Sequence, residues 1–598
     1  MPRAKGICMK ERFVRLITAE GEHLGSMPHG DYPRPSLRRE GGNSKYTILN
    51  GKWRFRSRYN DCEIMVPFCP ESLLSGVKEK VIYGEKLCWE RSFTLADIPA
   101  DSRVLLHFGA VSGESEVFVN GIGVAKNSNG YIPFSADITD AVKDGVNTLR
   151  VEVVHDLSPR HPHGKQRKKR GGMWYTPVSG IWQTVWLETV PQRYIAEVTV
   201  DADDTAAEIT VHICDAVTGQ TNGPNTDRSS SAQAGAEHGT QLITAVCEGR
   251  EYVFTDGKVR IEPENRELWS PENPRLYDVT VKCGEDEVRT YFALRKLEIK
   301  EVNGKKRLCL NGEPYFFNAV LDQGYFSDGL YTPADLSLYG QDIMRMKALG
   351  FNTLRKHIKL EPERFYYDCD RLGMIVFQDM VNNGYYNFIR DTALPTVGLR
   401  RRPALLNSRP AVKDEFLDAM EKTVKLLRNH PSICCWTIFN EGWGQTDADG
   451  AYRRLKKLDP TRFIDATSGW FKEHESDVES LHIYFKPLKL GSDRTRPQVL
   501  SEFGGFVHKC PDNSFNREKT YGYGIYESRE EFAKIVRKKF EDEVIPLAKE
   551  GLCASVYTQV SNVEDETNGL LTFDRRVCKL LPEDMEGVAG ALRAAVRL

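Results

Sequence analysis

Several features that would assign a chain to a compartment or to a charged ligand are missing here. No run of apolar residues approaches the ~18 that a membrane span requires. Residues 1–16 lack an apolar core of the length found in an export signal, and the 14 cysteines include no Cys-x-x-Cys pair. With 82 basic and 84 acidic residues, the formal net charge of −2 creates no overall field for nucleic acid or an anionic membrane. We therefore expect a reduced, cytoplasmic protein that binds neither.

The chain of 598 residues is too long for one hydrophobic core, and its apolar pattern changes along its length. Residues 1–190 contain runs of strand length separated by turn residues, which predicts a β jelly roll. Residues 191–297 continue this pattern at the length of an immunoglobulin-like β-sandwich. In residues 298–598, strand patterns alternate with helix patterns. The sequence therefore predicts a multidomain protein, with two all-β domains followed by a C-terminal α/β domain.

Eight apolar runs in this third region have the length of buried strands. They are Tyr315–Leu321, Asn352–His357, Met374–Asp379, Ile433–Asn440, Arg462–Thr467, Ser480–Tyr484, Gln498–Glu502 and Ala554–Gln559. Between several of them apolar residues recur at helical spacing, as in Ile343, Met346 and Leu349, whereas the fifth and sixth connections have little helical pattern. Eight strands with crossover helices predict a (β/α)₈ TIM barrel.

Two glutamates stand where a predicted strand gives way to a glycine-bearing loop. Glu441 follows the fourth strand and Glu502 ends the seventh. A carboxylate in such a place is costly unless it has partners or a function, and the chemistry of such barrels occurs at the C-terminal ends of the strands. Glycosidic-bond hydrolysis needs two carboxyl groups of this kind, so the pair predicts that reaction. The alternative is two capped or salt-bridged carboxylates with structural roles.

Other polar residues also fall at the predicted strand ends and would meet at one mouth of the barrel. Such convergence is typical of a cleft for a polyhydroxylated ligand, here an oligosaccharide or glycoside. For Asp379 and His357, support of the barrel is the alternative function. The candidates are Asp322, Arg355, His357, Asp379, His482, Tyr484, Tyr557, Thr558 and Gln559.

At these residues the chain resembles glycoside hydrolase family 2, over nearly its whole length. The matching segments are Tyr32–Pro35, Leu49–Trp53, Val66–Ser72, Gly180–Glu188, Trp269–Pro274, Leu276–Tyr277, Asn440–Glu441 and Ser501–Gly505. The resemblance implies a sugar-binding jelly roll, an immunoglobulin-like domain and a catalytic barrel. It also implies an exo-acting enzyme that cleaves a terminal sugar with retention of configuration.

The resemblance further implies a role for each matching site residue. Glu441 is similar to the acid/base of the family and Glu502 to its nucleophile. Asn440 resembles the residue that hydrogen-bonds the sugar 2-hydroxyl, while Tyr484 and Arg355 resemble the pair that orients the nucleophile. A nucleophile must stay ionised and an acid must begin protonated, so we expect a low pKa for Glu502 and a raised pKa for Glu441.

The sugar is the least constrained part of this interpretation. Tyr557 stands where many members have tryptophan, His482 belongs to a less common version of the sixth strand, and Asn516–Glu518 does not supply the Asn-x-Lys pair of uronate-binding members. Frequency within the family favours a β-galactosidase; β-glucuronidase, β-mannosidase and arabinosidase stay open, since Arg355 or the basic segment Lys165–Arg170 could hold a uronate.

Other expectations concern cofactors, assembly and the first domain. No acidic cluster marks a metal site, so we predict neither a metal nor a cofactor. A homo-oligomer stays open, and the non-enzymatic alternative is a catalytically inactive carbohydrate-binding protein. We also expect the segment Gly164–Trp174, rich in Lys and Arg, to shape the aglycone side of the cleft.

Overall fold

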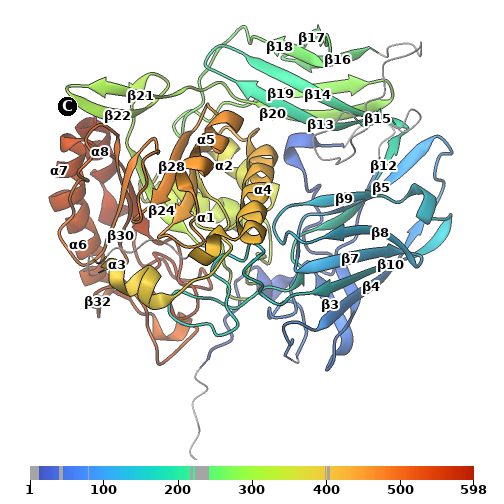
Figure 1. Ribbon diagram of the computed structural model, residues 1–598, viewed down its shortest axis with the longest axis horizontal. Helices are drawn as coiled ribbons and strands as arrows, with labels where there is room; N and C mark the ends of the chain where they lie inside the picture. The colour runs from blue at the N-terminus through green and yellow to red at the C-terminus, as the bar shows by residue number, and fades with distance from the viewer. Residues whose placement is uncertain are drawn as a thin grey trace, which may run out of the picture.

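The structure, a computed structural model, describes residues 13–39, 45–78, 80–215, 220–221, 242–396, 399 and 405–598. Two parts built of β-sheets lie beside a part in which strands and helices alternate (Figure 1). In that view the first β part is blue to teal on the right, the second is green at the top, and the α/β part is yellow to red on the left. This architecture confirms the predicted fold class, whereas the exact domain boundaries stay a prediction.

The first β part is a sandwich of two antiparallel sheets. One consists of β1 (Lys45–Ile48), β12 (Val185–Pro191), β5 (Ser102–Phe108) and β9 (Phe134–Asp137), and the other of β3 (Asp61–Val66), β2 (Gly51–Arg56), β4 (Lys86–Leu95), β10 (Gly145–Val154), β7 (Glu114–Val119) and β8 (Ile122–Asn127). A short ribbon pairs β6 (Val111–Ser112) with β11 (Gly180–Ile181). Burial alternates along β2, which places Trp53 and Phe55 in the core between the sheets, as a period of two requires.

The second β part is a smaller antiparallel sandwich. Its sheets are formed by β13 (Arg193–Ala202), β14 (Ala207–Asp215), β15 (Gln220–Thr221) and β18 (Lys258–Ile261), and by β17 (Arg250–Val253), β16 (Ile243–Cys247), β19 (Tyr277–Cys283) and β20 (Asp286–Phe292). Ile209 of one sheet and Val281 of the other belong to the same buried core. Facing apolar sides of this kind make two stacked sheets stable in water.

Eight parallel strands form the barrel, in the spatial order β28-β27-β26-β25-β24-β33-β30-β29. They are β24 (Phe317–Asp322), β25 (Thr353–Lys356), β26 (Ile375–Asp379), β27 (Ile433–Asn440), β28 (Phe463–Ser468), β29 (Glu479–Ile483), β30 (Gln498–Gly504) and β33 (Leu552–Thr558). All eight predicted strands are present. Across the seam between β28 and β29, Ser480 Oγ donates to Asp465 Oδ1 at 2.9 Å.

Helices cover the outside of the barrel, most visibly α6, α7 and α8 in Figure 1. The helices are α1 (Ser337–Ala348), α2 (Glu363–Leu372), α3 (Leu394–Thr396), α4 (Pro410–Leu427), α5 (Ala448–Leu458), α6 (Arg529–Lys539), α7 (Ile545–Glu550) and α8 (Val588–Ala595). Amphipathic α2 buries Phe365, Tyr366 and Cys369 and ends at Gly373, whose φ of 71° suits glycine. As predicted, the connections before and after β29 contain no α-helix. Within the described residues, none of the helices combines the length and apolarity needed to span a membrane.

Smaller strands complete the structure around the barrel. They are β21 (Leu297–Val302), β22 (Lys305–Leu310), β23 (Glu313–Pro314), β31 (Val507–His508) and β32 (Ile525–Tyr526). The first three form a sheet of their own that precedes β24 in the chain, and the last two pair in parallel.

A buried charge cluster joins the two β parts. Glu188 of β12 is fully buried and accepts hydrogen bonds from Arg34 Nη2 at 2.9 Å and from Arg39 Nη1 at 2.8 Å. Arg39 also donates to Asp286 of β20, at 3.0 Å. Burial alone would raise the pKa of Glu188, but the arginines outweigh it and hold the pKa well below its usual range. The cluster therefore connects the two β parts through buried charges that neutralise one another.

Replacing Glu188 tests this connection. Glu188→Ala leaves buried Arg39 and half-buried Arg34 with too little negative charge. Loss of one buried partner typically costs about 3–5 kcal/mol. We expect a matching fall in the urea midpoint followed by tryptophan fluorescence. Glu63→Ala, which breaks only an exposed pair with Lys52, should leave the midpoint unchanged. A Glu188→Ala midpoint equal to the wild-type value would contradict the role assigned to the cluster.

Candidate active site

A cleft of about 240 Å³ opens at the C-terminal ends of the barrel strands. Its lining includes Glu441 and Glu502 from the barrel, and also Lys165 and Met173 from the connection between β10 and β11 of the first β part. The carboxyl ends of parallel barrel strands meet at one mouth, which explains why residues distant in the sequence share this cavity.

Glu502 lies on β30, only 6% exposed, and two neighbours bond its carboxylate. Arg355 Nη1 donates to Oε1 at 3.2 Å, and the Tyr484 hydroxyl donates to Oε2. Burial alone would raise the pKa of Glu502, but the charges of His482, when protonated, and of Arg355 outweigh it and lower that pKa. Burial raises the pKa of Tyr484 well above its ordinary value, so this phenol stays a donor. Glu502 is therefore held as an anion.

Glu441 follows β27 directly and adopts a φ of 51°, which is uncommon for a residue with a side chain. Two bonds to its backbone fix this turn: its N–H donates to the Ser468 carbonyl at 2.9 Å, and Trp470 Nε1 donates to its carbonyl at 3.1 Å. Burial raises the pKa of Glu441, and the negative charge of Glu502 adds to that rise, although the bond from His482 opposes it. This carboxyl group is therefore suited to carry a proton.

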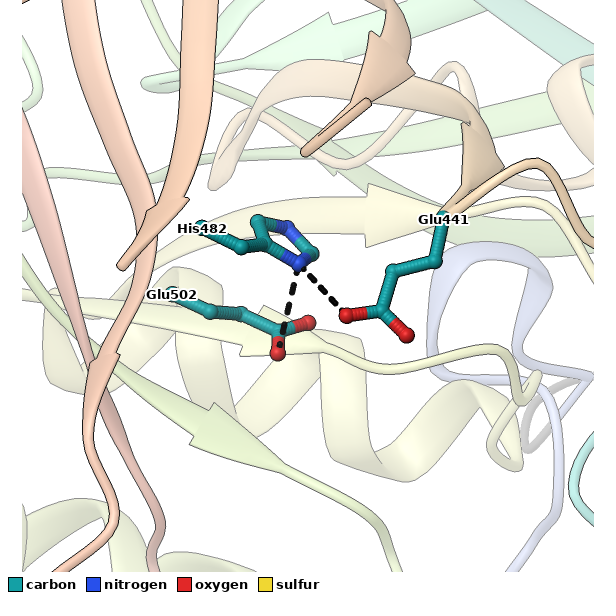
Figure 2. A group of neighbouring side chains, drawn as sticks. All are labelled: Glu441, His482 and Glu502. Atoms are coloured by element: carbon teal, nitrogen blue, oxygen red, sulfur yellow. Dashed lines mark hydrogen bonds and ion pairs between the residues drawn. The ribbon is translucent and has the colours of Figure 1, made fainter. Parts of the chain in front are cut away.

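His482 of β29 lies between the two carboxylates, and Figure 2 shows one ring nitrogen directed at both. The nitrogen is Nδ1, at 2.9 Å from Glu441 Oε1 and 3.6 Å from Glu502 Oε2. One oxygen of each carboxylate and this nitrogen all lie within 4.8 Å of one another. Atoms at that spacing could also ligate a metal ion, so the expected absence of a metal stays a prediction.

Arg355 of β25 organises the floor of the cleft. Its Nε and Nη2 atoms donate to the two oxygens of Asp379, each at 3.0 Å, and Nη2 also donates to Asn440 Oδ1 at 2.8 Å. Asp379 accepts a further bond from His357 Nδ1 at 2.8 Å, and burial lowers the pKa of His357 to about 4. Asn440 has its oxygen occupied, so its amide NH₂ group is left to donate into the cleft that it lines.

Three of the predicted binding residues lie away from the cleft and have partners elsewhere. Asp322 accepts from Lys356 Nζ at 2.6 Å and faces α1. Tyr557 packs on Phe503 and Phe540 in the core, and Gln559 Nε2 donates to Asn568 at 2.8 Å. We therefore correct the expectation that these three contact substrate.

The reason is the alternation of side chains along extended chain, which sends neighbours to opposite sides. Leu321 and Gln323, on either side of Asp322, line the cleft, and so does Thr558, between Tyr557 and Gln559. Asp379 and Arg355 also lie outside the lining, beneath the residues that form it. His357, Asn440, His482 and Tyr484 do line it, together with the two glutamates.

Models of three domains from one family match the chain. The model described as glycosyl hydrolase 2 galactose-binding domain-like matches residues 72–183, that of glycosyl hydrolases family 2 matches 185–295, and the TIM barrel domain of that family matches 301–501. The chain belongs to glycoside hydrolase family 2.

Relatives in family 2 differ in the sugars for which they are named. A β-galactosidase of Leuconostoc mesenteroides is 26% identical over 69% of this chain and 37% of its own length. A β-D-glucuronidase structure from Dictyoglomus thermophilum has a TM-score of 0.70 at 18% identity, over 95% of this chain and 99% of that one. A β-galacturonidase structure from Eisenbergiella tayi has a TM-score of 0.66 at 18% identity, over 94% and 99%. The chain spans 35% to 43% of the length of the first three curated relatives.

Sequence reasoning missed several residues of this family 2 cleft, which are Trp443, Trp470, Tyr521, Tyr523 and Glu566. Trp443 follows Glu441 by two residues, so its place beside the strand end was available as a signal. Tyr521 and Tyr523 come from a loop without periodic pattern, and nothing local indicated their position. Lys165 and Met173 belong to the segment Gly164–Trp174, which was expected to shape the cleft, and both line it. That they lie on the aglycone side stays a prediction.

The Arg355 network predicts a stability effect that depends on pH. Arg355→Met leaves Asp379 and Glu502 buried without their main cation, which should cost about 3–5 kcal/mol at neutral pH. Burial raises the pKa of Asp379, and Arg355 now more than offsets this. In the variant the folded-state pKa would exceed the unfolded one, so protonation at lower pH would relieve the loss.

The measurement is the difference in melting temperature between wild type and Arg355→Met at pH 7.5 and pH 5. We expect a large difference at the higher pH that narrows at the lower one. Arg54→Met, which breaks an exposed pair with Asp61, serves as the control and should melt like the wild type at both. A difference that does not depend on pH would rule out the electrostatic explanation.

Proposed function

We propose that this protein is a retaining glycoside hydrolase that removes a terminal sugar. The observation that carries the proposal is a pair of buried carboxyl groups with oxygens within 4.8 Å and with pKa shifts of opposite sign. Retaining enzymes place their two carboxyl groups about 5–5.5 Å apart, whereas inverting enzymes need about 6.5–9.5 Å to admit a water. The spacing here favours retention.

In the first step Glu441 would protonate the glycosidic oxygen while Glu502 attacks the anomeric carbon. The bond to the leaving group breaks, and a glycosyl ester forms on Glu502. That ester consumes the negative charge of Glu502, which removes one of the causes that raise the pKa of Glu441. Glu441 can then accept a proton from water, which hydrolyses the ester with a second inversion.

The surrounding groups support these two roles. Arg355 and Tyr484 donate to the Glu502 carboxylate and keep it ionised and oriented for attack. The Asn440 amide, fixed through its oxygen by Arg355, would donate to a sugar hydroxyl beside the anomeric carbon. His482 would stabilise Glu441 after it has given up its proton, since their contact of 2.9 Å favours the anion.

The identity of the sugar is a separate proposal from the reaction type. The β-galactosidase prediction rested on frequency within the family, and it agrees with the name of the Leuconostoc mesenteroides relative. The solved structures named above are a glucuronidase and a galacturonidase, which act on acidic sugars by their names. The side chains that line this cleft must therefore decide which sugar it accepts.

A sugar-binding protein without catalysis remains the second candidate. Such a protein would need hydroxyl-binding groups and aromatic platforms, and the cleft provides both in Asn440 and Trp443. It would have no use for two buried carboxyl groups at reacting distance, whose burial is costly. The hydrolase is therefore the better proposal.

A panel of nitrophenyl glycosides tests the reaction. We expect wild type to hydrolyse at least one β-glycoside and Glu502→Ala to lose about 10⁴-fold or more, because the covalent route is removed. Proton NMR of the first-formed product should show the starting anomeric configuration. Glu473→Ala, which removes a carboxylate that does not line the cleft, is the control and should keep wild-type rates. A first product of inverted configuration would refute the mechanism.

The pH profile of kcat/KM tests the two carboxyl roles. Activity requires ionised Glu502 and protonated Glu441, so the profile should be bell-shaped. His482→Leu removes a side chain that lowers the pKa of both glutamates, so both limbs should move to higher pH. His474→Leu, at an exposed site, should leave the profile unchanged. If the acid limb of the His482→Leu profile does not shift, His482 does not lower the pKa of Glu502, and the proposed effect of their contact is wrong.

A further inference from the structure

Lys165 is a buried cation that belongs to the first β part but lies in the catalytic cleft. Its residue is only 7% exposed, and its side chain lines the cavity with Glu441 and Glu502. No described residue accepts a hydrogen bond from Nζ or forms an ion pair with it; its neighbours are the rings of Trp443 and Tyr175, at 5.7 and 5.6 Å. An ammonium that opens on the cleft without a protein acceptor is available to bond a ligand that supplies one.

The backbone around Lys165 is fixed against the barrel. Gly164 has a φ of 58°, and a Cβ placed there would lie 2.8 Å from the Ile358 carbonyl oxygen, so only glycine fits. The Lys165 carbonyl accepts from the Tyr175 N–H at 3.1 Å, and Gln166 Nε2 donates to Tyr131 at 2.9 Å. The ammonium is therefore presented to the cleft in advance of any ligand, which lowers the entropic cost of binding.

The other long cations of the basic segment have different positions. Arg167 lies over the rings of Trp174 and Tyr386, and Arg170 pairs with Glu564 at 3.2 Å. Lys168 and Lys169 are exposed. Within the segment 165–170, then, Lys165 is the cation that reaches the cleft.

Lys165 lies close enough to the reacting groups to act on the sugar that is cleaved. Its charge lowers the pKa of Glu441, of Glu502 and of His357, which line the same cleft. Glu502 and Glu566 also line this cavity, and their carboxylates would repel an anionic ligand in the absence of a cation. Glu566 already accepts a bond from the Tyr175 hydroxyl.

We propose that Lys165 binds a carboxylate on the terminal sugar, so that the preferred substrate is a uronide and not a neutral glycoside. The inference rests on the proposed hydrolase function and deepens it. A carboxylate would supply the acceptor that Nζ lacks, and a charge-assisted bond in a buried site is strong. Lys486 and Lys489, which also line the cleft and are exposed, add to the positive potential at its rim.

Matched pairs of substrates test this proposal. The measurement is kcat/KM for the 4-nitrophenyl β-glucuronide and β-glucoside, and for the β-galacturonide and β-galactoside. Wild type should prefer one uronide over its neutral partner. Lys165→Met should lower kcat/KM for that uronide about 30-fold or more, because loss of one partner of a buried charged bond costs about 2–5 kcal/mol. The neutral partner should lose at least about 10-fold less than the uronide, since part of the effect on both substrates comes from the charge of Lys165 acting on Glu441 and Glu502. Lys165→Arg should restore part of the uronide activity.

The controls separate selectivity from other roles of the charge. Lys169→Met removes the same charge from an exposed position of the segment and should leave all four rates unchanged. If Lys165→Met lowers kcat/KM equally for the uronide and for its neutral partner, Lys165 acts only on the pKa of the catalytic carboxyl groups. That result would overturn the proposal. So would a wild-type preference for the neutral sugars, or no turnover of either uronide.

A different result would contradict the proposed hydrolase function itself. Glu502→Ala would then retain wild-type rates, whichever sugar is preferred. If wild type hydrolyses neutral glycosides in a Glu502-dependent manner, the hydrolase stands and only the uronide assignment falls.

Discussion

The guanidinium of Arg355 is the constraint on which the rest of the site depends. From β25 it bonds to Asp379 on β26, Asn440 on β27 and Glu502 on β30, so one side chain fixes groups from three other strands of the barrel. It also donates to the Ser501 carbonyl at 2.9 Å, beside Glu502. A planar donor group of fixed shape suits this task, since a lysine could not hold two carboxylates and an amide at once.

Because Arg355 lies on the side of Glu502, it separates the properties of two chemically identical glutamates. Glu502 has a guanidinium and a phenol as donors, whereas Glu441 has His482 and otherwise lies buried at a backbone turn. The same burial that raises the pKa of Glu441 is outweighed at Glu502 by positive charge. Environment alone therefore makes one group suited to remain an anion and the other to hold a proton.

Much of the fold could be predicted from the sequence because buried parallel strands read as short apolar runs. The run Ile433–Asn440 coincides with β27 at both ends, and the other seven strands lie where runs were found. The positions of Glu441 and Glu502 at strand ends followed from the same count. The side of the strand to which each side chain points was harder to predict, because a shift of one residue moves a side chain to the opposite face. Asp322 and Tyr557 were therefore expected in the cleft but lie outside it.

Contacts between distant segments were the hardest part of the site to predict residue by residue. Tyr521 and Tyr523 come from an irregular loop, and Lys165 comes from another domain, so periodicity within the barrel carries no information about them. His482 was predicted as a binding residue, but its place between both carboxylates depends on the packing of β29 beside β30, which local sequence does not specify.

The Gly164 contact with Ile358 has a consequence for how such a protein can change over time. The carboxylates reside in the barrel, while the buried ammonium is carried by a loop of a different sandwich and held in register by a single glycine. Reaction chemistry and the charge that a ligand meets are thus encoded in separate stretches of the gene. Substitutions in one short loop can alter that charge without disturbing any catalytic strand.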